Sequence, residues 1–219
     1  MNIGDLKTRL LGLDTASLCD ASKSLRVMDA GIRPLRTGRK LIGVAHTATC
    51  YDDFLTVIKA LRDAAPGAAL VVDTRGSLRA VAGELFSTEA QRKGLAGLII
   101  DGPVRDTARV RELDLPVYAR TITPMAGTTA RLFTTQTPVR CGGVTVSPGD
   151  IIFGDDDGII VAAPEELEPL IPLAEAIQAR EARILARLEG GESLLDMLNF
   201  DEHARAIQEG RESQLKFLV

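Results

Sequence analysis

Aromatic residues and membrane-length apolar runs are scarce in this sequence. Of its 219 residues only 4% are aromatic, and none is tryptophan. The longest apolar runs, such as residues 67–72, are far shorter than the roughly 20 residues that a helix needs to cross a bilayer. The first ten residues mix acids and bases and lack the apolar core of a signal peptide. We therefore expect neither a membrane protein nor a secreted one.

The cysteines are too few and too widely spaced for a disulfide framework or a zinc site. The three cysteines, Cys19, Cys50 and Cys141, are widely spaced and include no CxxC pair. An odd number of distant cysteines suits a reducing compartment and argues against a disulfide framework. Without a Cys/His cluster, a zinc site is disfavoured as well. These absences predict a cytoplasmic protein.

The composition that remains is that of a globular domain. Hydrophobic residues make up 45% and charged residues 26%, so the chain can bury enough apolar surface to fold without a disulfide or a metal. The net charge of −4 disfavours a nucleic-acid-binding protein. Residues 1–40 carry eight basic and four acidic side chains, whereas residues 164–219 carry six and twelve. The opposite charge of the two ends suggests that they meet, within or between subunits.

The middle of the chain has the pattern of a parallel α/β unit. Between residues 66 and 119, apolar strands and amphipathic helices follow one another in the order strand, helix, strand, helix, strand. The expected elements are strands at 69–72, 95–100 and 116–119 and helices at 85–93 and 106–113. We expect the middle strand to end in a turn at Asp101-Gly102.

Upstream of this unit the sequence predicts a loop, a strand and a helix. Residues 32–40 are basic and broken by proline and glycine, which indicates a loop, and residues 41–50 alternate like a strand. A helix capped by Asp52 or Asp53 follows. Its apolar face is expected to consist of Leu55, Ile58 and Leu61.

Downstream, tight turns separate short strands. Strands at 144–146, 151–153 and 158–162 predict a β-meander. The acidic run Asp155-Asp156-Asp157-Gly158 lacks the alternating acids and distal Glu of an EF-hand, so we interpret it as a hairpin turn. A long helix from about residue 173 is expected to end at Gly190-Gly191.

The segment IIDGPVRD, residues 99–106, is the most informative about chemistry. Parallel α/β sheets bind ligands beyond the carboxyl ends of their strands, and this is where Arg105 and Asp106 are expected. In a loop, neighbouring side chains can face one ligand. Arg offers a bidentate fork for a carboxylate and Asp a hard oxygen for Mg²⁺. The alternative is a surface turn with an ion pair worth at most about 1 kcal/mol.

The segment GELFST, residues 83–88, opens a predicted helix. The amides of a first helical turn lack partners within the helix, and together with the helix dipole they can hold an anion. Gly83 would let the backbone approach a ligand closely. A helix start without a ligand remains the alternative. We assign His46 and His203 structural or surface roles, and the sequence has no glycine-rich nucleotide-binding motif.

Taken together, three blocks resemble the RraA-like family, which includes the divalent-metal-dependent 4-hydroxy-4-methyl-2-oxoglutarate aldolases. The likeness runs from about Thr15 to the long C-terminal helix. The blocks are PGAALVVD (66–73), GELFSTEAQRKGLAGLIIDGPVRD (83–106) and GGVTVSPGDIIFGDDDGIIVAAP (142–164). The family often has a small aliphatic residue where this chain has Phe86. The resemblance implies a single-domain α/β fold, an α/β/β sandwich of the swivelling type, over residues 1–190. It leaves residues 191–219 as a helical extension that packs on the domain or on a neighbouring subunit.

The resemblance also implies roles for individual residues. Backbone amides of the segment Gly83–Phe86, which includes Glu84, and notably those of Leu85 and Phe86, would hold the carboxylate of a pyruvate moiety. Arg105 would bind its oxygens, and Asp106 would hold Mg²⁺ or Mn²⁺, so these two residues are the expected catalytic pair. Glu181 of a neighbouring subunit is a further candidate near the site.

The activity implied is that of a class II aldolase. Such an enzyme cleaves 4-hydroxy-2-oxo acids of the 4-hydroxy-4-methyl-2-oxoglutarate type to pyruvate through a metal-stabilised enolate, and oxaloacetate decarboxylation would pass through the same enolate. The expected assembly is a homo-oligomer, trimer or hexamer, without nucleic-acid or membrane partners. The alternative is a non-catalytic regulator that binds an endoribonuclease, because some members of the family act in that way.

Overall fold

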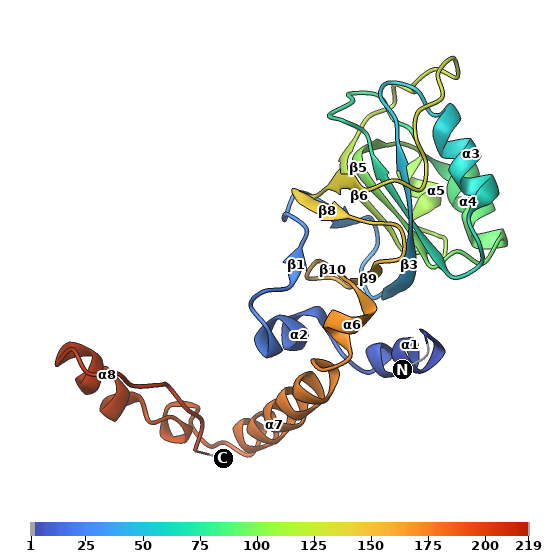
Figure 1. Ribbon diagram of the computed structural model, residues 1–219. Helices are drawn as coiled ribbons and strands as arrows, with labels where there is room; N and C mark the ends of the chain where they lie inside the picture. Colours follow the sequence, from blue (N-terminus) through green and yellow to red (C-terminus); the bar gives the residue numbers. More distant parts are fainter. Residues whose placement is uncertain (1–2, 219) are drawn as a thin grey trace.

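Strand β3 (Leu41–Thr49) lies in the middle of the main sheet of the computed structural model, which describes residues 3–218. The sheet has eight strands in the order β1-β10-β9-β3-β4-β5-β6-β2, and it curls strongly (Figure 1). On one side of β3 the neighbours are parallel, namely β4 (Ala68–Asp73), β5 (Gly97–Val104) and β6 (Val117–Ile122). The parallel α/β unit predicted for residues 66–119 is therefore confirmed.

The other side of β3 is antiparallel. It consists of β9 (Ile151–Gly154), β10 (Ile159–Ala162) and the short strand β1 (Arg26–Val27). The turn between β9 and β10 closes with a hydrogen bond from the amide of Asp155 to the carbonyl of Gly158, which confirms the hairpin at the acidic run. At the far edge, β2 (Arg33–Pro34) pairs with β6, so the expected loop at 32–40 contains a two-residue strand.

The predicted meander is wrong in its pairing. Strand β8 (Val144–Val146) does not continue into the β9–β10 hairpin but pairs with β7 (Val139–Cys141) as a separate ribbon. Between the ribbon and the curled sheet lies a buried cluster that includes Tyr118 and Ile152. The ribbon thus closes one end of the curl. Sequence spacing could not show this, because both arrangements use the same tight turns.

Strand β5 is longer than predicted, and this extension positions the site. It continues through Asp101-Gly102 to Val104, with a register shift between Ile100 and Pro103. The shift lets the strand accommodate a proline, which regular pairing would not. At Gly102 an added Cβ would lie 2.3 Å from the Thr74 hydroxyl oxygen, so only glycine fits there. Arg105 consequently follows the end of a buried strand directly.

Three helices cover one face of the parallel strands, namely α3 (Leu55–Asp63), α4 (Glu84–Arg92) and α5 (Thr107–Val110). The N-cap of α3 is Phe54, not the predicted Asp52 or Asp53, although Asp53 accepts a hydrogen bond of 2.9 Å from the Leu55 amide. The buried face of α3 is formed by Val57, Ala60 and Leu61, whereas Ile58 is 40% exposed. The predicted apolar face is therefore wrong by part of a helical turn.

Helices from both ends of the chain complete the structure; those nearest the sheet pack on it in a buried cluster that includes Leu10, Leu18 and Phe153, whereas the C-terminal ones extend away from it (Figure 1). The terminal helices are α1 (Ile3–Leu11), α2 (Thr15–Ala21), α6 (Pro164–Leu167), α7 (Ile171–Glu189), the 3-10 turn η1 (Leu195–Met197) and α8 (Phe200–Gln208). Arg9 of α1 forms a two-bonded ion pair with Glu175 of α7 at 2.6 and 2.9 Å. The basic start and the acidic end therefore do meet within one chain. Within residues 3–218 no helix is long and apolar enough to cross a membrane.

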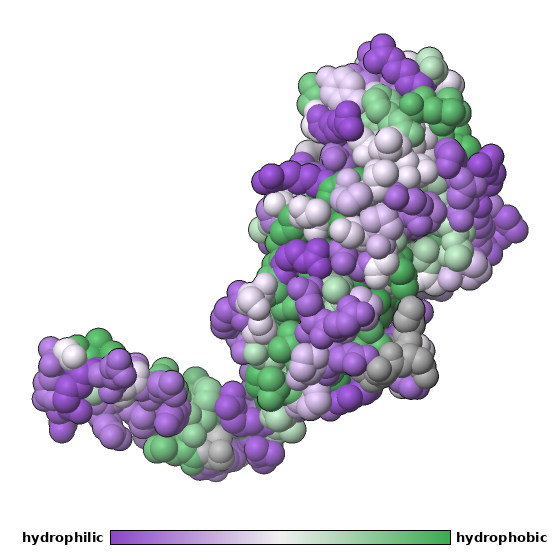
Figure 2. All heavy atoms as spheres, in the orientation of Figure 1, coloured by the Kyte–Doolittle hydropathy of each residue, from purple (hydrophilic) through white to green (hydrophobic). Residues whose placement is uncertain are grey.

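The segment after α7, residues 191–218, forms an arm that carries hydrophobic side chains on its surface. Leu195 is 70% exposed and Ile207 is 56% exposed, and Figure 2 shows hydrophobic patches among the polar residues of this arm. The arm folds back on itself, since the amide of Leu218 donates to the carbonyl of Met197. The division at residue 190 and the packing of residues 191–219 on the domain or on a neighbouring subunit stay predictions.

Candidate active site

A small hollow lies where β5 ends and helices α4 and α5 begin. Its volume is about 120 Å³. The lining residues come from the starts of α3 and α4, the end of β5 and two loops: Phe54, Ala80, Val81, Ala82, Gly83, Leu85, Phe86, Arg105, Asp106 and Ala126. This is the ligand-binding edge expected of a parallel sheet.

The N-terminus of α4 forms one wall, and Gly83 is the residue before its first turn. The φ of Gly83 is −167°, which any residue can adopt, so the requirement for glycine is one of space. A Cβ at this position would lie 2.5 Å from Asp106 Oδ2 and 2.9 Å from Arg105 Cγ. The amide of Glu84 donates to Asp106 Oδ2 at 3.3 Å. The helix start and the Arg–Asp pair are thus packed directly together.

Arg105 and Asp106 both line the hollow although they are neighbours in sequence. The reason is the backbone of Asp106, whose φ of 55° and ψ of 34° are left-handed. Such a conformation costs a non-glycine residue roughly 1 kcal/mol or more and turns its side chain away from the regular path. Asp106 Oδ2 lies 3.4 Å from Arg105 Nε, and both side chains are about two-fifths exposed, at 40% and 42%.

The carboxylate of Asp106 does not cap α5, the helix that it precedes. Asp106 occupies the residue before α5, yet it makes no side-chain capping bond there. It is therefore held in a strained conformation for contacts outside α5, which is typical of functional residues. Glu84, by contrast, does not line the hollow, because its carboxylate lies 3.5 Å from Arg109 Nε on α5. Only the backbone of Glu84 takes part in the site.

The side chains at the hollow fit a hard divalent cation that keeps most of its water. Among residues 3–218 there is no group of three or more His, Cys, Asp or Glu side chains that could enclose a metal ion. Mg²⁺ commonly binds through one or two carboxylates, with water and substrate oxygens at its other positions. Asp106 supplies one such carboxylate, and because Gly83 has no Cβ the carboxylate can lie against the start of α4. Zinc sites usually include His or Cys ligands, and neither residue type lines the hollow.

Phe54 and Ala126, which were not predicted from the sequence, line the hollow together with the predicted Phe86. Phe54 and Phe86 pack edge to face, with ring centroids 5.6 Å apart and an interplanar angle of 67°. Ala126 comes from a loop that is anchored by the buried carboxylate of Asp53, which accepts hydrogen bonds from Thr128 Oγ1 at 2.7 Å and from the Ala130 amide at 2.6 Å. Burial alone would raise the pKa of Asp53, but these bonds lower it below its ordinary value.

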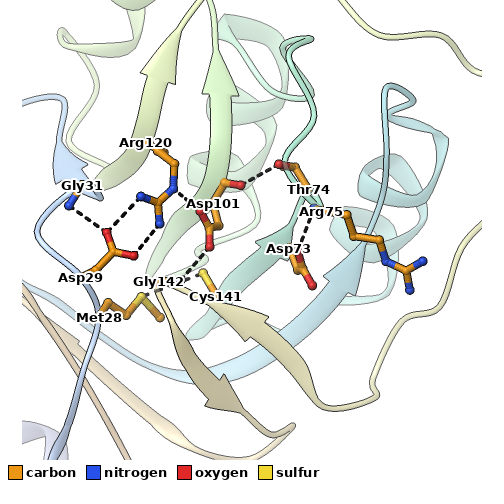
Figure 3. Close-up of polar contacts among 10 residues, drawn as sticks. All are labelled: Met28, Asp29, Gly31, Asp73, Thr74, Arg75, Asp101, Arg120, Cys141 and Gly142. Atoms are coloured by element: carbon orange, nitrogen blue, oxygen red, sulfur yellow. Dashed lines mark hydrogen bonds and ion pairs between the residues drawn. The ribbon is translucent and has the colours of Figure 1, made fainter.

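A second polar network supports the strand that carries the site (Figure 3). Asp101 of β5 accepts from Arg120 Nε at 2.5 Å and from the Gly142 amide at 2.7 Å. Arg120 of β6 also donates to both carboxylate oxygens of Asp29 at 3.0 and 2.7 Å. The network therefore ties β5 to β6, to the 28–31 segment and to the β7–β8 ribbon. We expected Asp101 in a turn, whereas it lies inside a strand as a structural anchor.

The remaining candidates lie elsewhere. Glu181 belongs to α7, at the opposite end of the molecule from α4, so it does not reach the hollow of its own chain (Figure 1). His203 lies 3.0 Å from Ser213 Oγ in the C-terminal arm. His46 is buried on β3 beside a larger cavity of about 450 Å³ between α1 and the sheet. That cavity lacks an Arg–Asp pair, so the smaller hollow remains the candidate active site.

The fold and the hollow define an α/β protein with a charged pair and a helix N-terminus at the ends of its parallel strands. The chain belongs to the RraA-like family, whose model, described as "RraA-like: Aldolase/RraA", matches residues 15–161.

The similarity to individual proteins covers most of the chain. A protein of Halalkalibacterium halodurans named "Putative 4-hydroxy-4-methyl-2-oxoglutarate aldolase" is 33% identical over 80% of this chain and 84% of its own. An uncharacterised protein of Methanocaldococcus jannaschii is 36% identical over 91% of this chain and 96% of its own. Among solved structures, an RraA-family protein of Streptomyces coelicolor, described as an unusual member of the RNase ES inhibitor family, superposes with a TM-score of 0.72 at 28% identity, covering 85% of this chain and 98% of its own. These matches confirm the predicted family and its mixed α/β fold.

Proposed function

We propose that the protein is a divalent-metal-dependent aldolase that releases pyruvate from 4-hydroxy-2-oxo acids of the 4-hydroxy-4-methyl-2-oxoglutarate type. The observation that carries the proposal is the contact of Gly83 with Asp106 and Arg105, which places a helix N-terminus, a guanidinium and a carboxylate around one small hollow. The aldolase names of relatives that are 32–34% identical support the same activity.

Substrate binding would use the two positive features of the hollow. The amides of Leu85 and Phe86 belong to the first turn of α4, where helical amides lack acceptors within the helix. They would donate to the carboxylate of the 2-oxo acid, and the helix dipole favours that negative charge. The guanidinium of Arg105 would bind the same end of the substrate through two parallel hydrogen bonds. Together these groups fix the C2 carbonyl relative to Asp106.

Cleavage breaks the C3–C4 bond. The C4 hydroxyl loses its proton and becomes the carbonyl of the leaving fragment, while the bonding electrons pass to C3 and the C2 oxygen as the enolate of pyruvate. Arg105 would stabilise the negative charge as it develops on that oxygen. A divalent cation held by Asp106, either Mg²⁺ or Mn²⁺, supplies Lewis acidity when bound. Protonation at C3 then gives pyruvate, and loss of CO₂ from oxaloacetate leads to the same enolate.

The surroundings of the hollow agree with a mechanism that needs no Schiff base. Of the ten residues that line it, none is a lysine. Lys93, at the far end of α4, donates instead to the carbonyl oxygens of Leu61 and Arg62, each at 2.6 Å. An imine-forming amine is therefore not available among the lining side chains.

We propose in addition that the protein works as a homotrimer or hexamer, in which Glu181 of a neighbouring subunit lies near the site.

Pyruvate release tests the proposal directly. The purified protein is given 4-hydroxy-4-methyl-2-oxoglutarate or oxaloacetate, with Mg²⁺, with Mn²⁺ or with EDTA, and pyruvate is followed through lactate dehydrogenase. We expect metal-dependent release that Asp106→Ala reduces by at least about a hundredfold, since the cation loses its protein ligand. Asp156→Ala, in the β9–β10 turn, is the control and should keep its activity. If neither substrate released pyruvate with either metal, the proposed aldolase function would be excluded.

The second candidate is a regulator that binds an endoribonuclease. The similarity to the Streptomyces coelicolor structure, which is described as a member of an RNase inhibitor family, favours it. This candidate predicts a stable complex with an RNase E-type enzyme, measured by size-exclusion chromatography. The complex should form equally well with Asp106→Ala, because the regulator would not need the metal ligand.

A further inference from the structure

The cavity of about 450 Å³ between α1 and the sheet is separate from the hollow, since the two share no lining residue. Its volume lies in the range of pockets that bind small molecules. Of the fourteen residues that line it, eleven are glycine, proline or aliphatic, and the others are Lys7, His46 and Gln136. A mostly apolar wall with a few polar side chains is the usual composition of a ligand pocket.

His46 occupies a place on β3 where the fold calls for an apolar residue. Its side chain shares one face of the strand with Ile42 and Val44, which pack beneath the terminal helices, and with Ala48 and Cys50, which pack beneath α3 and α4. His46 is only 8% exposed within the single chain, and its Nε2 is buried without a hydrogen-bond partner among residues 3–218. An unpaired polar group of this kind destabilises a fold, so its presence points to a partner from outside the chain.

The polar side chains of the cavity are all able to donate hydrogen bonds, and none is acidic. Gln136 is held beside β3, where its Oε1 accepts from the Thr47 amide at 3.1 Å and its own amide donates to the Thr47 carbonyl at 2.9 Å. Its side-chain NH₂ group is not used in that pair. Burial lowers the pKa of His46, so the ring is uncharged at neutral pH and carries one N–H. Lys7, on the exposed side of α1, is the only charged lining residue, so the cavity suits an anion.

We propose that this cavity is a second ligand site, which binds a medium-chain aliphatic carboxylate. Its carboxylate would accept hydrogen bonds from His46 and Gln136 and lie close to the charge of Lys7, while its hydrocarbon chain would cover the aliphatic lining. Each methylene group that becomes buried should raise the affinity up to about fourfold. A short, highly polar 2-oxo acid would leave that lining uncovered, so the site is distinct from the candidate active site. The proposal does not depend on the aldolase function.

Histidine NMR tests the proposal, because the chain contains only His46 and His203. The full-length protein, labelled with ¹⁵N, is titrated with octanoate while the ring nitrogens are observed. Acetate, which has only the carboxylate, and 1-octanol, which has only the chain, are the matched probes. We expect the His46 signals to shift and saturate while those of His203, in the C-terminal arm, stay in place. Octanoate should bind at least about tenfold more tightly than either probe.

Two variants, measured by calorimetry with octanoate, identify the groups that bind it. His46→Leu should weaken binding at least about tenfold, since a hydrogen bond to a charged group is lost. Its melting temperature should not fall, because leucine fills the space without an unpaired nitrogen; a purely structural histidine would give the opposite result. Lys7→Met should weaken binding about threefold. Lys23→Met is the control, because Lys23 pairs with Asp20 and does not line the cavity.

The other outcomes each overturn the proposal. Octanoate up to about 10 mM might leave the His46 signals unmoved, which would mean that the cavity takes no such ligand. Equal shifts at both histidines, or equal affinity for 1-octanol, would show unspecific association. Wild-type affinity in His46→Leu would place the ligand elsewhere. If a second copy of the chain fills the cavity, the His46 signals will change on dilution and octanoate will not bind.

Discussion

Gly83→Ala tests the site without removing any functional group. The added methyl would lie 2.5 Å from Asp106 Oδ2 and 2.9 Å from Arg105 Cγ, distances that real side chains do not tolerate. The backbone itself accepts alanine, because φ is −167°. The overlap must therefore be relieved by movement of the two functional side chains, which are about two-fifths exposed and can swing towards solvent.

The expected consequence is a large loss of activity with a small loss of stability. A displacement of about 1 Å in a catalytic group commonly costs about a hundredfold in rate. The fold loses no buried contact, and replacing glycine by alanine before a first helical turn costs only a few tenths to about 1 kcal/mol. We therefore expect kcat/KM for pyruvate release to fall about a hundredfold while the melting temperature changes by only a few degrees.

Gly158→Ala is the matched control, since no heavy atom lies within 4 Å of its added Cβ and its φ is not positive. It should keep wild-type activity. Full activity of Gly83→Ala, measured with the same metal and substrate, would refute the reasoning, because it would show that the crowding of Arg105 and Asp106 has no bearing on catalysis. A large fall in melting temperature would instead show that Gly83 has a structural role.

Three further predictions concern single charges. Arg105→Lys should lower kcat/KM about a hundredfold, since a point charge cannot replace a bidentate fork; kinetics equal to the wild type would remove Arg105 from the site. Arg120→Met should destabilise the fold by about 2 kcal/mol in urea unfolding, because Asp101, with 16% of its side chain exposed, loses its ion pair; an unchanged midpoint would contradict this. Arg120 lowers the pKa of Asp29 from its ordinary 3.8. The ion pair stabilises the fold fully above the pKa that Asp29 has in the unfolded chain, and this stabilisation is lost as the pH falls through the lower pKa of Asp29 in the folded protein. Below about pH 4 the Asp29→Asn variant should therefore approach the wild type in stability.

The parallel strands could be predicted because their signal is local. β4 and the first half of β5 are continuous apolar runs between turns, as strands buried on both faces are expected to be. The end of β5 could not be predicted in the same way. Asp101-Gly102-Pro103 has the composition of a turn, and only the contact of Gly102 with Thr74 and the anchoring of Asp101 by Arg120 keep the strand extended. Those contacts join segments that are distant in sequence.

The residues of the site also divide into those with a local sequence signal and those placed by contacts between distant segments. Gly83, Arg105 and Asp106 were found because each lies beside a recognisable strand or helix end. Phe54 and Ala126 reach the hollow from loops that Asp53 holds together through hydrogen bonds to residues 128–131. Asp53 was predicted only as a helix cap, and nothing in the local sequence indicates that its second oxygen anchors another loop.

Because aromatic residues are scarce in this chain, the position of two phenylalanines at one hollow is informative. The chain has six phenylalanines and no tryptophan, yet two of the six meet at this hollow. The buried clusters of the core otherwise consist mostly of aliphatic side chains. The fold therefore does not depend on aromatic packing in general. An edge-to-face pair adds only about 1 kcal/mol beyond the area that it buries. Because aliphatic side chains could fill that space at similar stability, the more specific consequence of the two rings is the apolar surface they present to whatever Arg105 binds.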